Sequence, residues 1–291
     1  MGYLPDRAEL EAIGVAENEF VLAQVSDLHF GDARFDPALA LAVADEINEL
    51  GPDLFVVAGD LTERGYREQF DEAVEWLGSI ECKRRLVIPG NHDARNVGYI
   101  HFSETLGPRY SSQTLQLGGQ RTLLVGLDTS KPDLNQGELG RSNHLWLYEQ
   151  CSQEADFKIL ALHHHLVSVP GTGRERNILW DAGDILEILV ETGVDLVLCG
   201  HKHVPYVWEM MGMTLSTSGT ACTKRTRGKT PPSFSIVRVE PERTVVTMRN
   251  TGQTTGRVAT VARRRPLDTG TAPRRRGLQT ARATSKVAVS A

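Results

Sequence analysis

Residues 85–93 read RLVIPGNHD, and this stretch decides the fold class. A short β-branched, apolar run, typical of a buried strand, passes directly into a Gly-Asn-His-Asp cluster. The same order returns in FVLAQVSDLH (20–29), DLFVVAGD (53–60), FKILALHHH (157–165) and VDLVLCGHKH (194–203). Helical patterns separate several of these runs, and this β-α alternation predicts a layered α/β domain.

The elements between and after these runs complete the outline. Helices are predicted over residues 37–50, 66–79, 143–151 and 182–192, and a further strand over 122–128. Asp36 before Pro37 is a credible cap and first turn for the first of these helices. From Tyr206 onward short strands and turns replace the helical patterns, which predicts an antiparallel region.

Length and composition exclude several classes of protein. The chain has 291 residues, of which 40% are hydrophobic and 24% charged, enough to bury a core. No apolar run approaches the roughly 18 residues of a membrane span, and the N-terminus lacks the order of a secretory signal. Four separated cysteines without a CxxC pair predict neither a disulfide framework nor a thiolate zinc site. We expect a cytoplasmic protein.

Charge is divided unevenly along the chain. The net charge is -5, but residues 256–291 hold nine basic residues and one acid, so an acidic body carries a basic tail. Periodic hydrophobicity stops near residue 250, which predicts one domain over 1–250 and a disordered tail over 251–291. Clustered arginines attract polyanions, so nucleic acid or an anionic membrane surface are candidate partners of the tail. A solvated linker is the alternative.

Each expected central strand ends in a polar cluster. Ligands of α/β sheets bind beyond the carboxyl ends of strands, so clusters far apart in sequence could meet in one place. Their carboxylates, imidazoles and amide are donors for divalent transition metals. A site for two metals needs more donors than one loop provides, and one carboxylate must bridge. Gly59 and Gly90 precede two of the donors and permit tight turns.

The ordered set D-x-H, GD, GNHD, His and GH-x-H resembles the signature of the calcineurin-like metallophosphoesterase superfamily, most of all its bacterial cyclic-nucleotide phosphodiesterase-like branch. The resemblance covers residues 20–250 and implies an α/β (α+β) fold, a four-layer β-sandwich of two mixed sheets flanked by helices. It implies one metal held by Asp27, His29, Asp60 and His203, and a second held by Asp60, Asn91, His163 and His201. His165 stands where the family usually has proline, which leaves open whether His163 or His164 is the ligand.

The chemistry of such a centre assigns further roles. Two divalent cations can bridge a hydroxide nucleophile, with Mn or Fe preferred and Zn as the alternative. His92 follows ligand Asn91 directly, so we assign it as the general acid, with Asp93 as its orienting partner.

Substrate recognition is expected in the loops at residues 95–110, 131–141, 169–177 and 221–229. The predicted substrate contacts are His164, Arg225 and Arg227, because guanidinium groups suit phosphate oxygens. Lys202 is expected to face away from the site. Arg174 and Arg176 are weaker candidates.

The predicted function is a phosphodiesterase that hydrolyses a small-molecule phosphoester, with 3′,5′-cyclic nucleotides as the leading substrates. A phosphomonoesterase, a nuclease or a nucleotide-lipid pyrophosphatase are alternatives within the same superfamily, because loops rather than metals set specificity. A non-catalytic interaction scaffold is the alternative from a different class of function.

Overall fold

The computed structural model describes residues 19–172, 178–227 and 230–263. Its first sheet contains β1 (Phe20–Val25), β2 (Leu54–Ala58), β3 (Arg85–Ile88), β10 (Ser233–Val239), β11 (Arg243–Asn250) and β12 (Gly256–Ala262). Their order across the sheet is β12-β11-β10-β1-β2-β3. The strands β1, β2 and β3 run parallel and the others pair antiparallel, so this sheet is mixed.

The second sheet is mixed as well. It contains β4 (Ser111–Leu117), β5 (Gln120–Gly126), β6 (Phe157–Ala161), β7 (Leu196–Cys199), β8 (Tyr206–Met210) and β9 (Met213–Thr217). Their order is β4-β5-β6-β7-β9-β8, with a parallel centre and an antiparallel strand at each edge.

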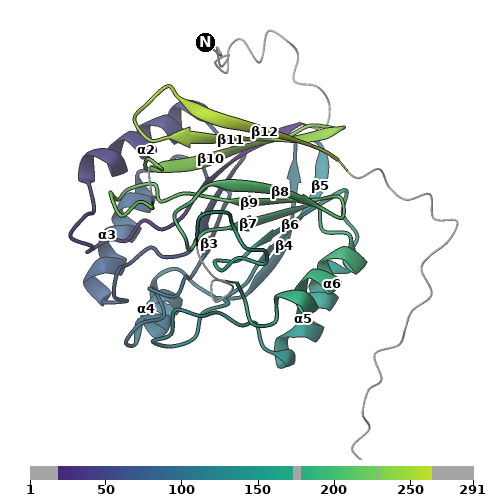
Figure 1. The fold of residues 1–291 in the computed structure, drawn as a ribbon, viewed down its shortest axis with the longest axis horizontal. Coiled ribbons are helices and arrows are strands. Elements are labelled where there is room, and N and C mark those ends of the chain that lie inside the picture. The colour runs from purple at the N-terminus through teal and green to yellow at the C-terminus, as the bar shows by residue number, and fades with distance from the viewer. Residues whose placement is uncertain (1–18, 173–177, 228–229, 264–291) are drawn as a thin grey trace, which may run out of the picture.

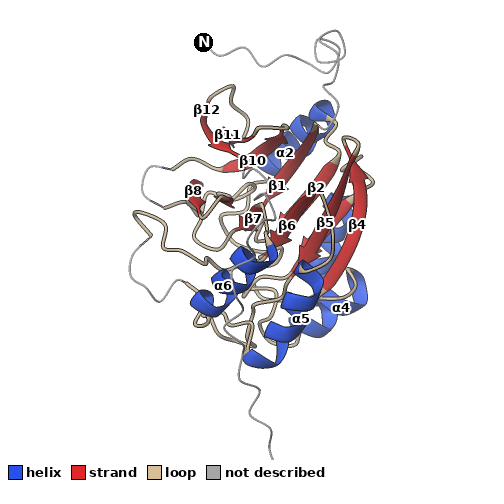
Figure 2. Cartoon of the chain, turned by 90° about the vertical axis from the view of Figure 1, so that its right-hand side faces the viewer, coloured by secondary structure: helices blue, strands red, loops and turns tan. Residues whose placement is uncertain are grey.

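Helices cover the outer faces of the two stacked sheets. They are α2 (Pro37–Leu50), α3 (Arg67–Gly78), α4 (Gly98–Thr105), α5 (Arg141–Cys151) and α6 (Ala182–Thr192). Figure 1 shows α2, α3 and α4 on one side of the molecule and α5 and α6 on the other, and Figure 2 shows the strands of both sheets between them. The predicted four-layer α/β sandwich is therefore confirmed. No helix among the described residues combines the length and apolarity needed to span a membrane.

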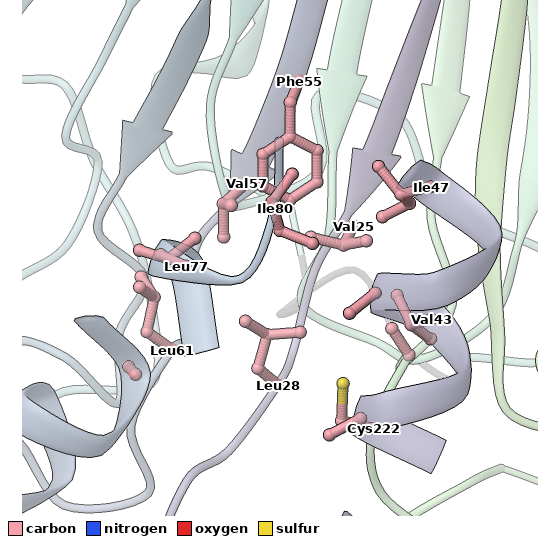
Figure 3. Packing of buried hydrophobic residues seen from close by; sticks show 14 of the residues in the cluster. Val25, Leu28, Val43, Ile47, Phe55, Val57, Leu61, Leu77, Ile80 and Cys222 are labelled. Atoms are coloured by element: carbon pink, nitrogen blue, oxygen red, sulfur yellow. The ribbon is translucent and has the colours of Figure 1, made fainter. Parts of the chain in front are cut away.

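Side chains alternate between the two faces of each strand, so the buried apolar residues form three clusters, one between the sheets and one between each sheet and its helices. On β1, Leu22 faces the space between the sheets, while Ala23 and Val25 pack against the helices. The helix-side cluster of the first sheet joins strand residues such as Phe55 to Ile47 of α2 (Figure 3). This packing fixes the strand ends relative to one another, which is what a site built at those ends requires.

The first helix begins and ends as predicted, because its caps are local. The Asp36 side chain accepts a hydrogen bond from the backbone N–H of Ala38, and Pro37 opens the first turn. Gly51, in the left-handed region with φ 56°, closes the helix and donates its N–H to the Ile47 carbonyl.

Several expectations are corrected by the structure. Helix α4 lies inside the segment 95–110 that was expected to be a loop, and strand β4 was not predicted. The strands after residue 206 are not purely antiparallel, because β9 pairs in parallel with β7.

The predicted boundary at residue 250 is also wrong. Strand β12 pairs with β11 along its whole length, and its few apolar contacts explain why periodicity missed it. Arg263 then stacks on Phe157 and donates to the Glu240 carbonyl, so the folded domain extends at least to residue 263. The rest of the predicted tail, 264–291, lies outside the described residues.

Candidate metal centre and active site

The predicted ligands converge at the carboxyl ends of five strands. Asp27 and His29 follow β1, Asp60 follows β2 and Asn91 follows β3 in the first sheet, while His163 follows β6 and His201 and His203 follow β7 in the second. All seven residues are buried, at 7% exposure or less. The carboxyl ends of the parallel strands of both sheets therefore lie close together, and their polar side chains form one buried centre in an otherwise apolar sandwich.

The first ligand group consists of Asp27, His29 and His203, whose donor atoms lie within 4.8 Å of one another. The His203 Nε2 atom is 3.1 Å from Asp27 Oδ1 and 3.1 Å from His29 Nε2. Asp60 Oδ2 is 3.9 Å from the same His29 nitrogen, so this carboxylate completes the predicted set.

The second group shares Asp60 with the first. Asp60, His163 and His201 again have donor atoms within 4.8 Å of one another, and His163 Nε2 is 3.2 Å from Asp60 Oδ2. The Asn91 Oδ1 atom is buried without a hydrogen-bond partner among the described residues. Asp60 thus occupies the position that a bridging carboxylate requires.

The protonation pattern of the imidazoles fits a pair of cations. Nδ1 of His163 donates to the Ala58 carbonyl at 2.7 Å, and Nδ1 of His203 donates to the Arg225 carbonyl. When Nδ1 carries the proton, Nε2 has a lone pair and no proton. The short contacts of His163 Nε2 with Asp60 and of His203 Nε2 with Asp27 are therefore contacts between two hydrogen-bond acceptors. Such contacts are repulsive unless a cation or a proton lies between them. The residues present therefore fit divalent metals.

Backbone strain is concentrated on the same residues. Eight non-glycine residues of the described chain have positive φ, and five of them are predicted ligands: Asp27, His29, Asp60, His201 and His203. Each such backbone conformation costs on the order of 1–3 kcal/mol and persists only because contacts with the surrounding structure hold it in place. Strain of this kind after three of the five strands, β1, β2 and β7, is expected of a functional centre.

The glycines before the ligands are required by close packing. A Cβ on Gly90 would lie 2.2 Å from Asp60 Oδ1, and one on Gly59 would lie 2.5 Å from His163 Nδ1. These approaches confirm the expectation that glycine at both positions permits the backbone to come close to a ligand.

Comparison with known proteins identifies the family. The family model described as calcineurin-like phosphoesterase matches residues 20–205. The chain belongs to the calcineurin-like phosphoesterase family. It is a metal-dependent phosphoester hydrolase, as the sequence predicted, and six of the seven predicted ligands lie in groups of His and Asp residues that could hold a metal ion.

Relatives of this calcineurin-like phosphoesterase include named phosphodiesterases. A probable cyclic nucleotide phosphodiesterase of Synechococcus is 28% identical, over 64% of this chain and 74% of its own. A glycerophosphodiester phosphodiesterase of Enterobacter lignolyticus is 28% identical, over 68% of this chain and 76% of its own. A purple acid phosphatase of yellow lupin shares the fold, with a TM-score of 0.63 at 12% identity, over 86% of this chain and 55% of its own.

A cavity of about 310 Å³ opens onto four of the predicted metal ligands of this phosphoesterase. It is lined by Arg34, Asp60, Asn91, His92, Arg95, Asn135, His201, Lys202, His203, Arg225, Thr226 and Arg227. The predicted contacts Arg225 and Arg227 are on its wall. Lys202 is there too, so the expectation that it faces away from the site is wrong.

His92 lines the cavity and contacts Glu63, a residue that was not among the predicted site residues. Its Nδ1 lies 2.8 Å from the Glu63 carbonyl and 3.0 Å from the Glu63 carboxylate. Burial lowers the pKa of His92, but the negative charges of Asp60 and Glu63 outweigh it and raise that pKa. Glu63 stands three residues after Asp60 in GDLTERG, and only this fixed offset from a predicted ligand could have suggested it.

Asp93, the predicted orienting partner of His92, has a different role. Its carboxylate accepts hydrogen bonds from the backbone N–H groups of Gly90, Leu61 and Thr62 at 2.8–3.1 Å. Burial and the nearby Asp60 charge raise its pKa to about 6. Asp93 therefore joins the loops that follow β2 and β3, and the predicted contact with His92 is wrong.

The three consecutive histidines separate into three environments. Only His163 approaches Asp60, whereas His164 is hydrogen-bonded through Nδ1 to the Thr129 hydroxyl at 2.8 Å. His165 donates from Nε2 to the Gly200 carbonyl at 2.6 Å. His164 is 1% exposed and does not line the cavity, so the structure does not support its predicted substrate contact. Arg174 and Arg176 lie outside the described residues.

Proposed function

We propose that this hydrolase is a phosphodiesterase for small-molecule phosphodiesters, with 3′,5′-cyclic nucleotides as the first class to test. The observation that carries the proposal is the sharing of Asp60 by two ligand groups at the base of a cavity that His92 lines. Its relatives named as phosphodiesterases support the diester class.

The two metals would be held as the resemblance implies, by Asp27, His29, Asp60 and His203 for one and by Asp60, Asn91, His163 and His201 for the other. When bound, the cations supply the polarisation that makes water a nucleophile at neutral pH and clamp the phosphoryl oxygens. We prefer Mn or Fe to Zn, because the donor set is carboxylate, imidazole and amide without thiolate.

The chain's own groups then move the proton. The water oxygen forms a bond to phosphorus, the bond from phosphorus to the leaving oxygen breaks, and that oxygen takes a proton. His92 is the donor, because its Nδ1 is engaged with Glu63 and its Nε2 is left for the leaving group. An acyclic diester gives a phosphomonoester and an alcohol, whereas a 3′,5′-cyclic nucleotide gives a single nucleoside monophosphate that carries the freed hydroxyl.

The cavity arginines Arg225 and Arg227 differ in their ion-pair partners. The Arg225 guanidinium is 2.5 Å from Glu63 and 3.1 Å from Asp32, so we propose that it orients Glu63 as well as facing substrate. Arg227 is the freer of the two and is proposed as a direct phosphate contact.

The proposal is tested with a hydrolysis panel on metal-reconstituted protein, with metal content measured in parallel. The panel comprises bis-p-nitrophenyl phosphate, p-nitrophenyl phosphate, cyclic AMP, single-stranded nucleic acid and a nucleotide-sugar diphosphate. Preference for diesters is the expected result. Preference for the monoester, the nucleic acid or the diphosphate would establish instead the corresponding alternative from the sequence analysis.

Two variants test the assigned roles. Asp60→Ala should lose both metals and nearly all activity, because both ligand groups share that carboxylate. His92→Ala should keep the metals and lose about 10²–10⁴-fold in turnover. Unchanged activity of either variant would contradict the role of that residue. Cytoplasmic location and polyanion binding by residues 264–291 stay predictions, which fractionation and salt-dependent binding to RNA, DNA and liposomes would test.

A further inference from the structure

Five cationic side chains line the cavity, and three of them already have acidic partners. Arg34 lies 3.1 Å from Asp32, and Arg225 lies 2.5 Å from Glu63. Arg95 is 3.7 Å from Glu63. These three arginines share two carboxylates, Asp32 and Glu63, and their ion pairs hold the cavity wall together.

The remaining two cations, Lys202 and Arg227, have no such partner. Neither side chain makes an ion pair or a hydrogen bond with any residue in the described parts of the chain. Both side chains line the same cavity, where Lys202 is half-buried and Arg227 is exposed. Two unpaired positive charges on the wall of one cavity attract an anion that binds there.

The scissile phosphate does not account for these two charges. Two divalent cations held by the predicted ligands would be balanced by the carboxylates of Asp27 and Asp60, together with a hydroxide nucleophile and the single charge of a phosphodiester. Lys202 and Arg227 then remain unmatched. An arginine fork and a lysine ammonium together are well suited to the oxygens of a further phosphate.

We propose that Lys202 and Arg227 form a subsite for a second phosphate of the substrate. This inference rests on the proposed phosphodiesterase function and narrows its substrate to diesters that carry another phosphate. A 3′,5′-cyclic mononucleotide, with one phosphate, leaves the subsite empty. The second phosphate has two sources in nucleotide chemistry, namely the other diester of a cyclic dinucleotide and the terminal phosphate of a linear dinucleotide.

The kinetic test compares kcat/KM for cyclic AMP, cyclic di-AMP and a 5′-phosphorylated linear di-adenylate on the manganese-loaded enzyme. The two-phosphate substrates should exceed cyclic AMP by about tenfold or more, as one additional charge-assisted contact gives. The better of the two identifies the source of the second phosphate. Lys202→Gln and Arg227→Gln should each reduce this preference about tenfold, mainly through KM.

Lys224→Gln is the matched control. Lys224 is on the same loop as Arg227, but its ammonium is 2.7 Å from Asp36 and its side chain is 70% exposed, outside the cavity. Its removal changes the net charge equally and should leave the substrate preference as it is. Arg227→Gln is the decisive variant, because Lys202 stands between two predicted metal ligands and its replacement requires a check of metal content.

A binding measurement separates the subsite from turnover. Calorimetric titration of the full chain with adenosine 3′,5′-bisphosphate and with adenosine 5′-monophosphate should show about tenfold tighter binding of the bisphosphate. Arg227→Gln should abolish that difference. Equal affinities, or a preference that survives this variant, would overturn the second-phosphate subsite. Failure to cleave any diester, bis-p-nitrophenyl phosphate included, would instead overturn the proposed function.

Discussion

The Glu63 carboxylate lies 3.0 Å from Nδ1 of His92. The same carboxylate is 3.1 Å from Nδ1 of His29, a predicted metal ligand. Glu63 therefore contacts the Nδ1 atom of both the proposed general acid, His92, and the predicted metal ligand His29. A carboxylate in this position fixes the ring orientation and tautomer of its histidine and stabilises the imidazolium form.

Glu63→Gln should lower kcat about 10–100-fold, because the amide keeps a hydrogen-bond acceptor but removes the negative charge behind His92. We expect KM to change less than kcat. Asp32→Asn is the control, since Asp32 shares Arg225 as an ion-pair partner and should leave kcat within about threefold of wild type. Steady-state kinetics with metal analysis measure both. A wild-type kcat in Glu63→Gln would contradict this role.

Gly90→Ala should destabilise the protein and weaken metal binding. The new Cβ would lie 2.2 Å from Asp60 Oδ1 and 2.4 Å from the Asp60 backbone nitrogen, so the bridging carboxylate must move. The expected loss in free energy of unfolding is about 1–3 kcal/mol. Gly78→Ala, where nothing lies within 4 Å at the end of α3, should be neutral or stabilise by up to about 1 kcal/mol. Urea unfolding compares them, and equal stabilities would show that the Gly90 site relaxes.

The Asp181 carboxylate links α6 to the segment before α5 and should make stability depend on pH. Burial raises its pKa, but hydrogen bonds from His144 and from the N–H groups of Gly140 and Leu139 lower it below its ordinary value. A lowered folded-state pKa adds stability above the unfolded pKa, and this stability disappears as pH falls through the folded value.

Asp181→Asn should therefore be less stable than wild type at pH 7 by about 1–3 kcal/mol, since one backbone N–H loses its charged acceptor. The difference should shrink as pH falls below about 4, where the carboxyl of the unfolded chain takes up a proton, and should reach its minimum once pH falls below the lowered pKa of Asp181 in the folded protein. Unfolding curves at several pH values measure this. A difference that is constant with pH would show that the contribution is packing and not charge.

Deletion of residues 251–291 should damage the fold, whereas deletion of 264–291 should not. The longer deletion removes β12 from the edge of its sheet and the Arg263 contact with Phe157. A loss of about 2 kcal/mol would lower Tm by roughly 4–8 °C in a domain of this size. Thermal unfolding of the two truncated proteins tests this. Equal Tm values would mean that β12 contributes no stability.

The sequence predicted the central strands and their polar ends because both depend on local composition. Buried parallel strands read as apolar runs, and metal donors are recognisable residue types at fixed spacing. The first helix was predicted to the residue because Asp36 and Pro37, which start it, are neighbours in sequence. The order of five motifs then indicated the two ligand groups that the folded strands bring together.

Other features were decided only by tertiary structure. Strands β4 and β12 are edge strands with one buried residue each, and they are formed by backbone pairing with a neighbouring strand, which depends little on side-chain type. Whether Asp93 or Glu63 faces His92 depends on how two loops lie against each other. Whether Lys202 keeps a free charge depends on acids far away in the chain. Residue types are fixed by sequence, but which charges are neutralised depends on distance, and distance is set by the fold.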